Sequence, residues 1–375
     1  KDSLWTEYIQ SRKNLAKEIK RLKTEKFREF CNVAGKMDST EFIKTLNAIS
    51  KSKKRRLPTG LSNSPDKLDE YADHFQAIYN NDLPRPPQQL SWMMQCTSPD
   101  CDMSISVAEI RVALKELPKG KAVGMDNIPN EILKVAPLPI SYILATAFNV
   151  YARLSKVPTS WTVSVIKPVI KKGDPSLISN YRPISLSVTM RRLFEKIMLP
   201  RLTGVIEPLH KSQNGFRNRR GCLDAVASLN EDIVQNAKVS RKTHMIFLDI
   251  KAAYDSVDRS TLYARLAVMG VAPNMIIMLM RLFSENTSMV SVEGSTSKPI
   301  TLSHGLLQGS LLSPVLYSAF IDDAAYIVEE NYGRKAQPAR LLMYADDMVL
   351  YGTDPKIIQE ALNDLVQFAK DSRFQ

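Results

Sequence analysis

The chain has 375 residues, 44% of them hydrophobic, which is enough for one large domain or two to three smaller ones with a sizeable core. Lys and Arg outnumber Asp and Glu by 51 to 39, and this excess indicates a polyanionic partner, either nucleic acid or an acidic membrane surface. There is no run of about 18 apolar residues, which excludes a membrane-spanning helix.

The cysteines are spaced too irregularly for a zinc site or a disulfide framework. They form no CxxC pair and no His-x₃₋₅-His follows them, so we expect reduced thiols in an intracellular protein. The first residue is not Met, no signal peptide is visible and the last residue falls in an expected helix, which suggests a piece of a longer protein. The cysteines are Cys31, Cys96, Cys101 and Cys222.

Most of the positive charge lies in the first 60 residues, which hold 16 Lys and Arg but only 7 Asp and Glu. Residues 4–30 have the apolar spacing of an amphipathic basic helix. The basic cluster 51–56 fits either a solvated linker or a segment that binds nucleic acid or directs the protein to the nucleus. The Pro-rich stretch 81–104 predicts a linker.

Start signals predict the next helices. Ser64-Pro65-Asp66 places an N-cap before a proline at the first helical position. Ser106 and Glu109 form a capping box that opens a helix to about Leu117. The Gly/Lys loop 119–126 lacks the GxxxxGK[ST] pattern, which excludes a P-loop nucleotide triphosphatase. Residues 139–156 predict an apolar core helix.

A charged hairpin is expected in the middle of the chain. Its first strand is Val163–Ile170, and Lys171 and Lys172 occupy the turn before a second strand at Tyr181–Ser185. The cations fit either an ordinary charged hairpin or one that contacts phosphates. Long helices are expected at 187–206 and 222–237, joined by a turn at 213–217.

The run 245–250 predicts a buried strand that ends in Asp249. Burying a carboxylate is costly unless it is paired, and a metal ion is one possible partner. Asp255 is interpreted as structural, capping the turn that follows. The next predicted elements are helices at 259–269 and 273–284, strands at 287–293 and 298–302, a Gly-bracketed loop at 305–310 and a helix at 313–329.

Residues 341–351 predict a second hairpin, with Asp346 and Asp347 at its tip. Adjacent carboxylates repel each other, and Mg²⁺ would relieve that repulsion, but Asp is also a common turn residue. If Asp249 and Asp346 lie on adjacent strands, they could hold two Mg²⁺ ions about 4 Å apart, as nucleotidyl transfer requires. A final helix is expected from residue 355 onward.

Seven stretches in this order make residues 120–370 resemble the reverse transcriptase domain of non-LTR (LINE-type) retrotransposons. The chain departs from the family pattern at Leu307 and Ile170, where family members commonly have Pro. The matching stretches are Gly124–Pro129, Pro168–Asp174, Tyr181–Leu186, Gln213–Arg217, Phe247–Asp255, Leu307–Pro314 and the YADD motif Tyr344–Asp347.

The resemblance implies an α+β right-hand polymerase fold with fingers and palm in residues 106–375. Residues 1–105 are then a basic helical N-terminal extension with a linker, and the thumb is missing or truncated. The implied activity is that of an RNA-directed DNA polymerase, a nucleotidyltransferase that uses two Mg²⁺ ions, with Mn²⁺ as a substitute. The implied partners are an RNA template, a DNA primer or target and dNTPs, with no membrane, in the nucleus. The alternative is a catalytically silent fragment that only binds nucleic acid.

The resemblance also assigns roles to individual residues. Tyr254 matches the aromatic gate that excludes a ribose 2′-hydroxyl. The catalytic residues are Asp249, Asp346 and Asp347, and the metal ligands are these three and the carbonyl of Ile250. The dNTP-binding residues are Lys171, Arg182, Tyr254, Gln308 and Gly309, and the template-binding residue is Arg217.

Overall fold

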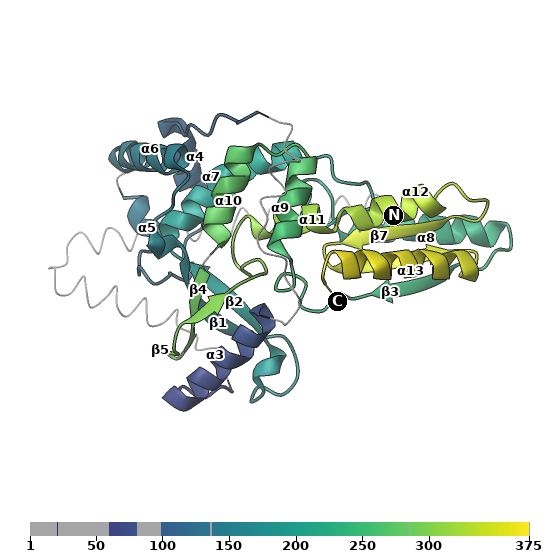
Figure 1. Ribbon diagram of the computed structural model, residues 1–375, viewed down its shortest axis with the longest axis horizontal. Coiled ribbons are helices and arrows are strands. Elements are labelled where there is room, and N and C mark those ends of the chain that lie inside the picture. The colour runs from purple at the N-terminus through teal and green to yellow at the C-terminus, as the bar shows by residue number, and fades with distance from the viewer. Residues whose placement is uncertain (1–20, 22–59, 81–98, 136, 285, 375) are drawn as a thin grey trace. The chain divides into compact units, whose positions relative to one another are not determined.

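The computed structural model describes residues 21, 60–80, 99–135, 137–284 and 286–374 (Figure 1). The chain divides into two compact units, residues 1–58 and 59–375. The expected helix at 4–30 (apart from Arg21), the basic cluster 51–56 and most of the linker 81–104 lie outside the described residues.

The second unit mixes helices and strands, as an α+β fold does. Its helices are α3 (Pro65–Tyr79), α4 (Val107–Glu116), α5 (Asn130–Leu133), α6 (Pro137–Leu154), α7 (Thr189–Ile206), α8 (Cys222–Lys238), α9 (Arg259–Val268), α10 (Pro273–Phe283), α11 (Ser313–Ile321), α12 (Asp323–Tyr332) and α13 (Pro355–Asp371). Its strands are β1 (Val163–Ile170), β2 (Tyr181–Ser187), β3 (His244–Leu248), β4 (Asn286–Val292), β5 (Ser295–Thr296), β6 (Ile300–Leu302), β7 (Ala339–Tyr344) and β8 (Asp347–Gly352).

Local signals placed several helix starts correctly. Pro65 occupies the first turn of α3, where its missing N–H is no loss. Both halves of the capping box form at α4, because the Ser106 hydroxyl accepts the Glu109 N–H and the Glu109 carboxylate accepts the Ser106 N–H. The last helix ends at Asp371, so the expectation that it runs to the last residue is wrong.

The first sheet is built around the charged hairpin, and its strand order is β2-β1-β4-β5, with β6 also paired to β4. Strand β1 runs antiparallel to β2 and parallel to β4, which lies more than 100 residues later. The apolar face of α3 packs against β4, β5 and β6 (Figure 1). The boundary between residues 105 and 106 stays a prediction for the catalytic domain, but the compact unit begins earlier, at Thr59.

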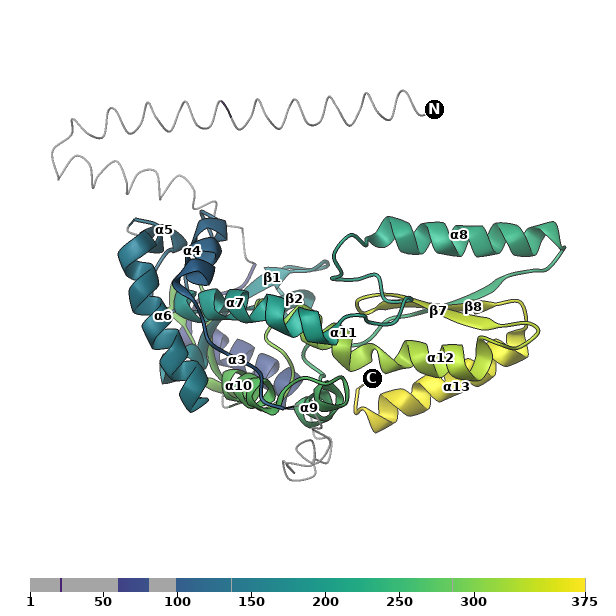
Figure 2. The same ribbon diagram turned by 90° about the horizontal axis from the view of Figure 1, so that it is seen from above.

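The second sheet has the order β3-β8-β7 and carries the acidic hairpin. Figure 2 shows α12 and α13 on one side of this sheet and α8 on the other. Leu341, Met343 and Leu350 are buried, and they lie on the face that α12 and α13 cover. The two helices therefore form the hydrophobic support under the β7–β8 turn.

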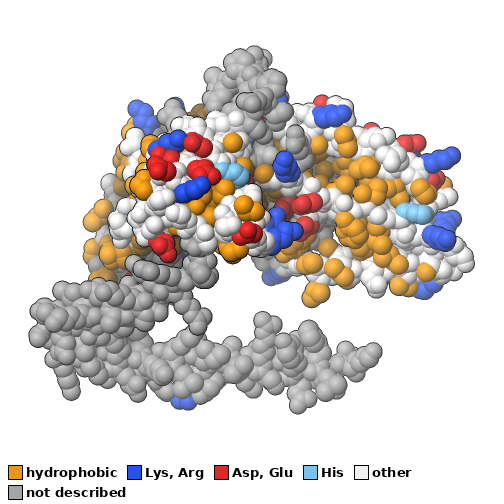
Figure 3. All heavy atoms as spheres, turned by 90° about the horizontal axis from the view of Figure 1, so that it is seen from below, with side chains coloured by type: hydrophobic (Ala, Val, Ile, Leu, Met, Phe, Trp, Pro, Cys, Tyr) orange, Lys and Arg blue, Asp and Glu red, His pale blue; other side chains and the backbone are white. Residues whose placement is uncertain are grey.

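Two predictions about these elements are wrong. Strand β3 was expected to be buried, but it pairs only with β8 at the sheet edge, and the Phe247 side chain is 75% exposed. Figure 3 shows hydrophobic side chains gathered on the face seen from below.

The helix expected at 313–329 is divided at Asp322, whose buried carboxylate accepts the backbone N–H of His210. This contact crosses 112 residues and has no local sequence signal.

A buried ion pair ties helix α7 to the rest of the core. Arg191 and Glu195 have fully buried side chains, and Arg191 Nε lies 2.7 Å from Glu195 Oε1. Arg191 also donates to the carbonyl of Trp161 and to Asn286 Oδ1, which links α7 to the end of the β1–β4 pairing at which both strands begin. Removing one partner would leave the other charge buried and unpaired, which is strongly destabilising.

Candidate active site

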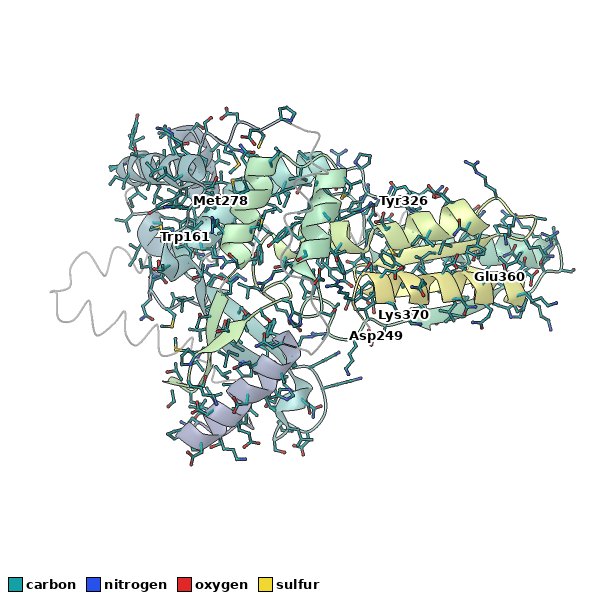
Figure 4. The ribbon with its side chains drawn as sticks, in the orientation of Figure 1. Trp161, Asp249, Met278, Tyr326, Glu360 and Lys370 are labelled. Carbon is teal, nitrogen blue, oxygen red and sulfur yellow. The ribbon has the colours of Figure 1, made fainter. Side chains whose placement is uncertain are left out.

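Three carboxylates meet at one end of the β3-β8-β7 sheet. Asp249 follows the last residue of β3, and its neighbour Leu248 pairs with Met348 of β8. Asp346 lies in the β7–β8 turn, and Asp347 begins β8 opposite Tyr344. Figure 4 shows Asp249 at the end of β3 nearest the first sheet. The expected adjacency of the strands that carry Asp249 and Asp346 is therefore present.

The β7–β8 turn is shifted by one residue from the expected tip, because Ala345 and Asp346 lie between the paired residues Tyr344 and Asp347. Ala345 has φ of 60°, a left-handed conformation that costs energy for a residue with a side chain. Asp347 was expected at the tip, but it is the first residue of β8.

Electrostatic interactions join the carboxylates. Burial raises the pKa of Asp346, and the neighbouring charges of Asp347 and Asp249 raise it further, whereas Arg182 opposes the shift. Within the described residues there is no cluster of three or more His, Cys, Asp or Glu side chains arranged to hold a metal ion. The side-chain oxygens of Asp249 and Asp346 are nevertheless the hard donors that Mg²⁺ prefers, and so is the backbone carbonyl oxygen of the adjacent buried residue Ile250.

The segment around Gln213 packs against the β7–β8 turn and stabilises it, which the sequence did not predict. Gln213 is fully buried, and its side-chain oxygen accepts the N–H groups of Ala345 and Gly215. Backbone hydrogen bonds join Asn214 N–H to Met343 O and Met343 N–H to Ser212 O. A Cβ at Gly215 would clash with the backbone nitrogen of Ala345. The Gln213–Arg217 motif was visible in the sequence, but not its contact with the YADD turn.

Arg217, expected to contact the template, makes internal contacts. Its guanidinium donates to the carbonyls of His210 and Gln213, at 3.0 and 3.2 Å. These bonds help to hold the Gln213 segment in place, and the template contact stays a prediction.

Tyr254 lies beside the carboxylates. Its ring stacks on that of Tyr317, with 5.1 Å between centroids and 18° between the ring planes. Burial raises the pKa of Tyr254, and the charge of Asp346 adds to the shift. The aromatic ring is thus half-buried, rigidly supported and near the acidic turn.

The cationic hairpin contributes Arg182 to the same region. Arg182 projects from β2 opposite Val169, its side chain is exposed, and its charge reaches Asp346. Lys171 follows β1 directly, and its side chain is also exposed. The structure therefore brings Arg182 toward the carboxylates, and Lys171 lies at the turn of the same hairpin.

The Gln308–Gly309 loop packs on the inner part of that hairpin. The Ser185 N–H donates to the Gln308 carbonyl at 2.7 Å, and a Cβ at Gly309 would clash with the Ser185 carbonyl. Gly309 also has φ of 135°, so this position suits glycine both by space and by backbone conformation.

Two further buried charged residues hold the loop, and the sequence did not indicate either of them. Glu195 Oε2 accepts the N–H of Leu311 at 2.9 Å. Arg259 donates to the carbonyls of His304 and Gly305 at 3.0 and 2.8 Å. The i to i+4 spacing of Arg191 and Glu195 was the one available signal, and it predicts a helix pair rather than contact with a distant loop.

The chain is similar in sequence to polymerases of mobile elements. The chain is 28% identical over 334 residues to a probable RNA-directed DNA polymerase from transposon BS of Drosophila melanogaster, covering 84% of this chain and 36% of that protein. It is 29% identical to the RNA-directed DNA polymerase from mobile element jockey of the same species, covering 72% of this chain and 30% of that protein. A solved telomerase structure from Candida tropicalis matches with a TM-score of 0.44 and 14% identity, over 65% of this chain and 49% of that chain.

The chain thus spans about a third of the length of these two curated relatives. Both are named as polymerases of mobile elements, which confirms the resemblance to non-LTR retrotransposons. The family described as reverse transcriptase (RNA-dependent DNA polymerase) matches residues 170–375, which is more than half of the chain and includes the three carboxylates. The chain belongs to the reverse transcriptase family.

Proposed function

We propose that this chain is the RNA-directed DNA polymerase core of a non-LTR retrotransposon. It would add dNTPs to the 3′-hydroxyl of a DNA primer by copying an RNA template. The observation that carries the proposal is the convergence of Asp249 and Asp346 from adjacent strands, with the cation Arg182 nearby. The net charge of +12 supports binding to nucleic acid.

Asp249 and Asp346 are the proposed metal-binding side chains, and the carbonyl of Ile250 is a further ligand. Asp347 adds negative charge beside Asp346, which attracts cations. The ions would be two Mg²⁺, with Mn²⁺ as a substitute. When bound, such a pair activates the primer hydroxyl and stabilises the leaving pyrophosphate.

The cationic hairpin and the loop beside it form the proposed nucleotide site. Lys171 and Arg182 would bind the triphosphate, because both side chains are exposed on the β1–β2 hairpin and the charge of Arg182 reaches Asp346. Tyr254 would contact the sugar and exclude a 2′-hydroxyl. Gln308 and Gly309 would border the incoming base, where the backbone at Gly309 allows close approach.

In the family's right-hand arrangement, the first sheet would belong to the fingers and the β3-β8-β7 sheet to the palm. Arg217 would act near the template by holding the Gln213 segment as well as by direct contact. None of the helices in the described part of the chain is long and apolar enough to span a membrane. The nuclear location that the resemblance implies stays a prediction.

The test is primer extension on an RNA template with dNTPs and Mg²⁺, for the unaltered chain, Asp249→Ala and the control Asp371→Ala. Asp371 is exposed at the end of α13, so its loss should leave extension unchanged. We expect extension by the unaltered chain and the control but not by Asp249→Ala. RNA binding without extension by any of the three would instead favour a fragment that only binds nucleic acid.

A further inference from the structure

A buried polar cluster lies behind Gln308 and is not used by the chemistry proposed above. Asp255 is 3% exposed, and its Oδ2 accepts a hydrogen bond from Gln308 Nε2 at 2.6 Å. Tyr79 of α3 and Ser185 of β2 are also buried there, and the pKa of Tyr79 is raised by the charge of Asp255 and lowered by the neighbouring Ser185 hydroxyl. Three segments that are far apart in the chain therefore gather around the segment that carries Asp255.

The burial of Asp255 among uncharged groups favours the neutral carboxylic acid. Among the described residues, Asp255 Oδ1 and the hydroxyl oxygens of Tyr79 and Ser185 have no partner at full hydrogen-bond geometry, although Tyr79 lies close enough to Asp255 to affect its pKa. A neutral carboxylic acid has one O–H donor and an acceptor oxygen, so it can accept from Gln308 and donate to a hydroxyl at the same time. An ionised carboxylate would leave a buried charge facing groups that do not neutralise it.

The pKa of Asp255 agrees with a neutral carboxylic acid. Burial raises the pKa of Asp255 to about 7, while Tyr79 and Gln308 oppose the shift. The positive charge of Arg259 influences Tyr79, and its guanidinium donates to the carbonyls of His304 and Gly305 in the same loop.

We propose that Asp255 is a positioning residue that fixes the side-chain amide of Gln308 for the incoming nucleotide. The hydrogen bond uses one N–H of the amide, which leaves the other N–H and the amide oxygen for the ligand. Gln308 is half-buried at the edge of the cluster, whereas Asp255 lies behind it, so Asp255 acts through Gln308. The inference rests on the proposed function, because it takes Gln308 as a contact of the dNTP.

The test compares Asp255→Asn, Asp255→Leu, Gln308→Leu and the double variant Asp255→Leu/Gln308→Leu. Asn keeps an acceptor for Gln308 and a donor for the hydroxyls. Leu has a similarly branched side chain but no group that forms hydrogen bonds. KM and kcat for dTTP are measured by primer extension on poly(rA) with an oligo(dT) primer. We expect Asp255→Leu to raise the KM about tenfold with a smaller change in kcat, which is the loss of about one hydrogen bond. Asp255→Asn should stay within about twofold of the unaltered chain.

The double variant separates positioning from a general structural role. If Asp255 acts through Gln308, adding Asp255→Leu to Gln308→Leu has no further effect on the KM. If the two effects multiply, the proposal is overturned. The same four variants are compared in free energy of unfolding, a readout that does not depend on polymerase activity.

The unfolding measurement also separates this inference from the proposed function. Should the unaltered chain fail to extend primers, the proposed polymerase function fails. Non-additive losses of unfolding free energy would still support the Asp255–Gln308 interaction, and additive losses would overturn it.

Discussion

At the scale of single residues, Tyr254 combines rigid support with nearness to the acidic turn. Its ring stacks on Tyr317 and its hydroxyl is influenced by Asp346. A ring held in this way can block a sugar hydroxyl, because it cannot move aside without losing the stacking contact.

Tyr254→Val is therefore expected to let the enzyme incorporate ribonucleotides. The ratio of kcat/KM for dNTPs over rNTPs should fall about tenfold to a hundredfold, as for other changes of shape in a binding pocket. The matched control is Tyr142→Val, since Tyr142 is exposed on α6. Unchanged discrimination in Tyr254→Val would remove the gate assignment.

Asp255 predicts a pH dependence of stability. Its pKa is about 7 in the folded protein and about 3.8 in the unfolded chain, so between these values the folded state binds one more proton. The contribution of Asp255 to stability is therefore fully present below pH 3.8 and is lost as the pH rises toward 7. The loss amounts to at most about 1.4 kcal/mol per pH unit.

Asp255→Asn removes this titration. In urea unfolding at pH 5, 6, 7 and 8, the variant should gain stability relative to the unaltered chain from pH 5 to 7 and then stay level. Parallel pH profiles for the two proteins would show that Asp255 is already ionised at pH 5.

At the scale of elements, the β7–β8 turn depends on the segment around Gln213. Backbone hydrogen bonds, the Gln213 side chain and the close approach of Gly215 all hold the turn from one side. Helices α12 and α13 support the same sheet on its buried face. Asp346 is thus presented by a turn with little freedom to move.

Gly215→Ala tests this support. The added methyl group would push Ala345 away and move Asp346, so extension should fall more than tenfold, with about 1–3 kcal/mol lost in the free energy of unfolding. Gly204→Ala is the control, because Gly204 lies in helix α7 and a Cβ there meets no atom within 4 Å. The control should be as active as the unaltered chain and slightly more stable. Equal activity of both variants would contradict the role of Gly215.

At the scale of the whole molecule, metal binding and nucleic-acid binding depend on different groups. The carboxylates occupy one end of the second sheet, whereas the excess positive charge is spread along the chain and is largest in residues 1–60. Phosphate contacts contribute most of the affinity for nucleic acid and make it sensitive to salt.

Asp346→Ala is therefore expected to abolish synthesis while RNA affinity changes less than about threefold. Filter binding at 50 and 200 mM salt should give the same steep salt dependence for both proteins, because the number of phosphate contacts is unchanged. Parallel losses of RNA affinity and synthesis would mean that the two functions are not separable.

The sequence by itself determined the features that depend on neighbouring residues. The proline in the first turn of α3, the capping box of α4, the two hairpins and the strand just before Asp249 follow from residues that lie close together in the chain. The motifs also identified the family and the candidate carboxylates, because the order of these short stretches can be read from the sequence without knowing the fold.

Only the tertiary structure decided which distant segments meet. The parallel pairing of β1 with β4, the break at Asp322 and the contact of Gln308 with Asp255 join residues 53 to 124 positions apart. Strand β3 is exposed because it lies at the edge of its sheet, although its apolar sequence resembles that of a buried strand. Local periodicity reports which face of an element is apolar, but the partner that covers this face is set by packing across the whole chain.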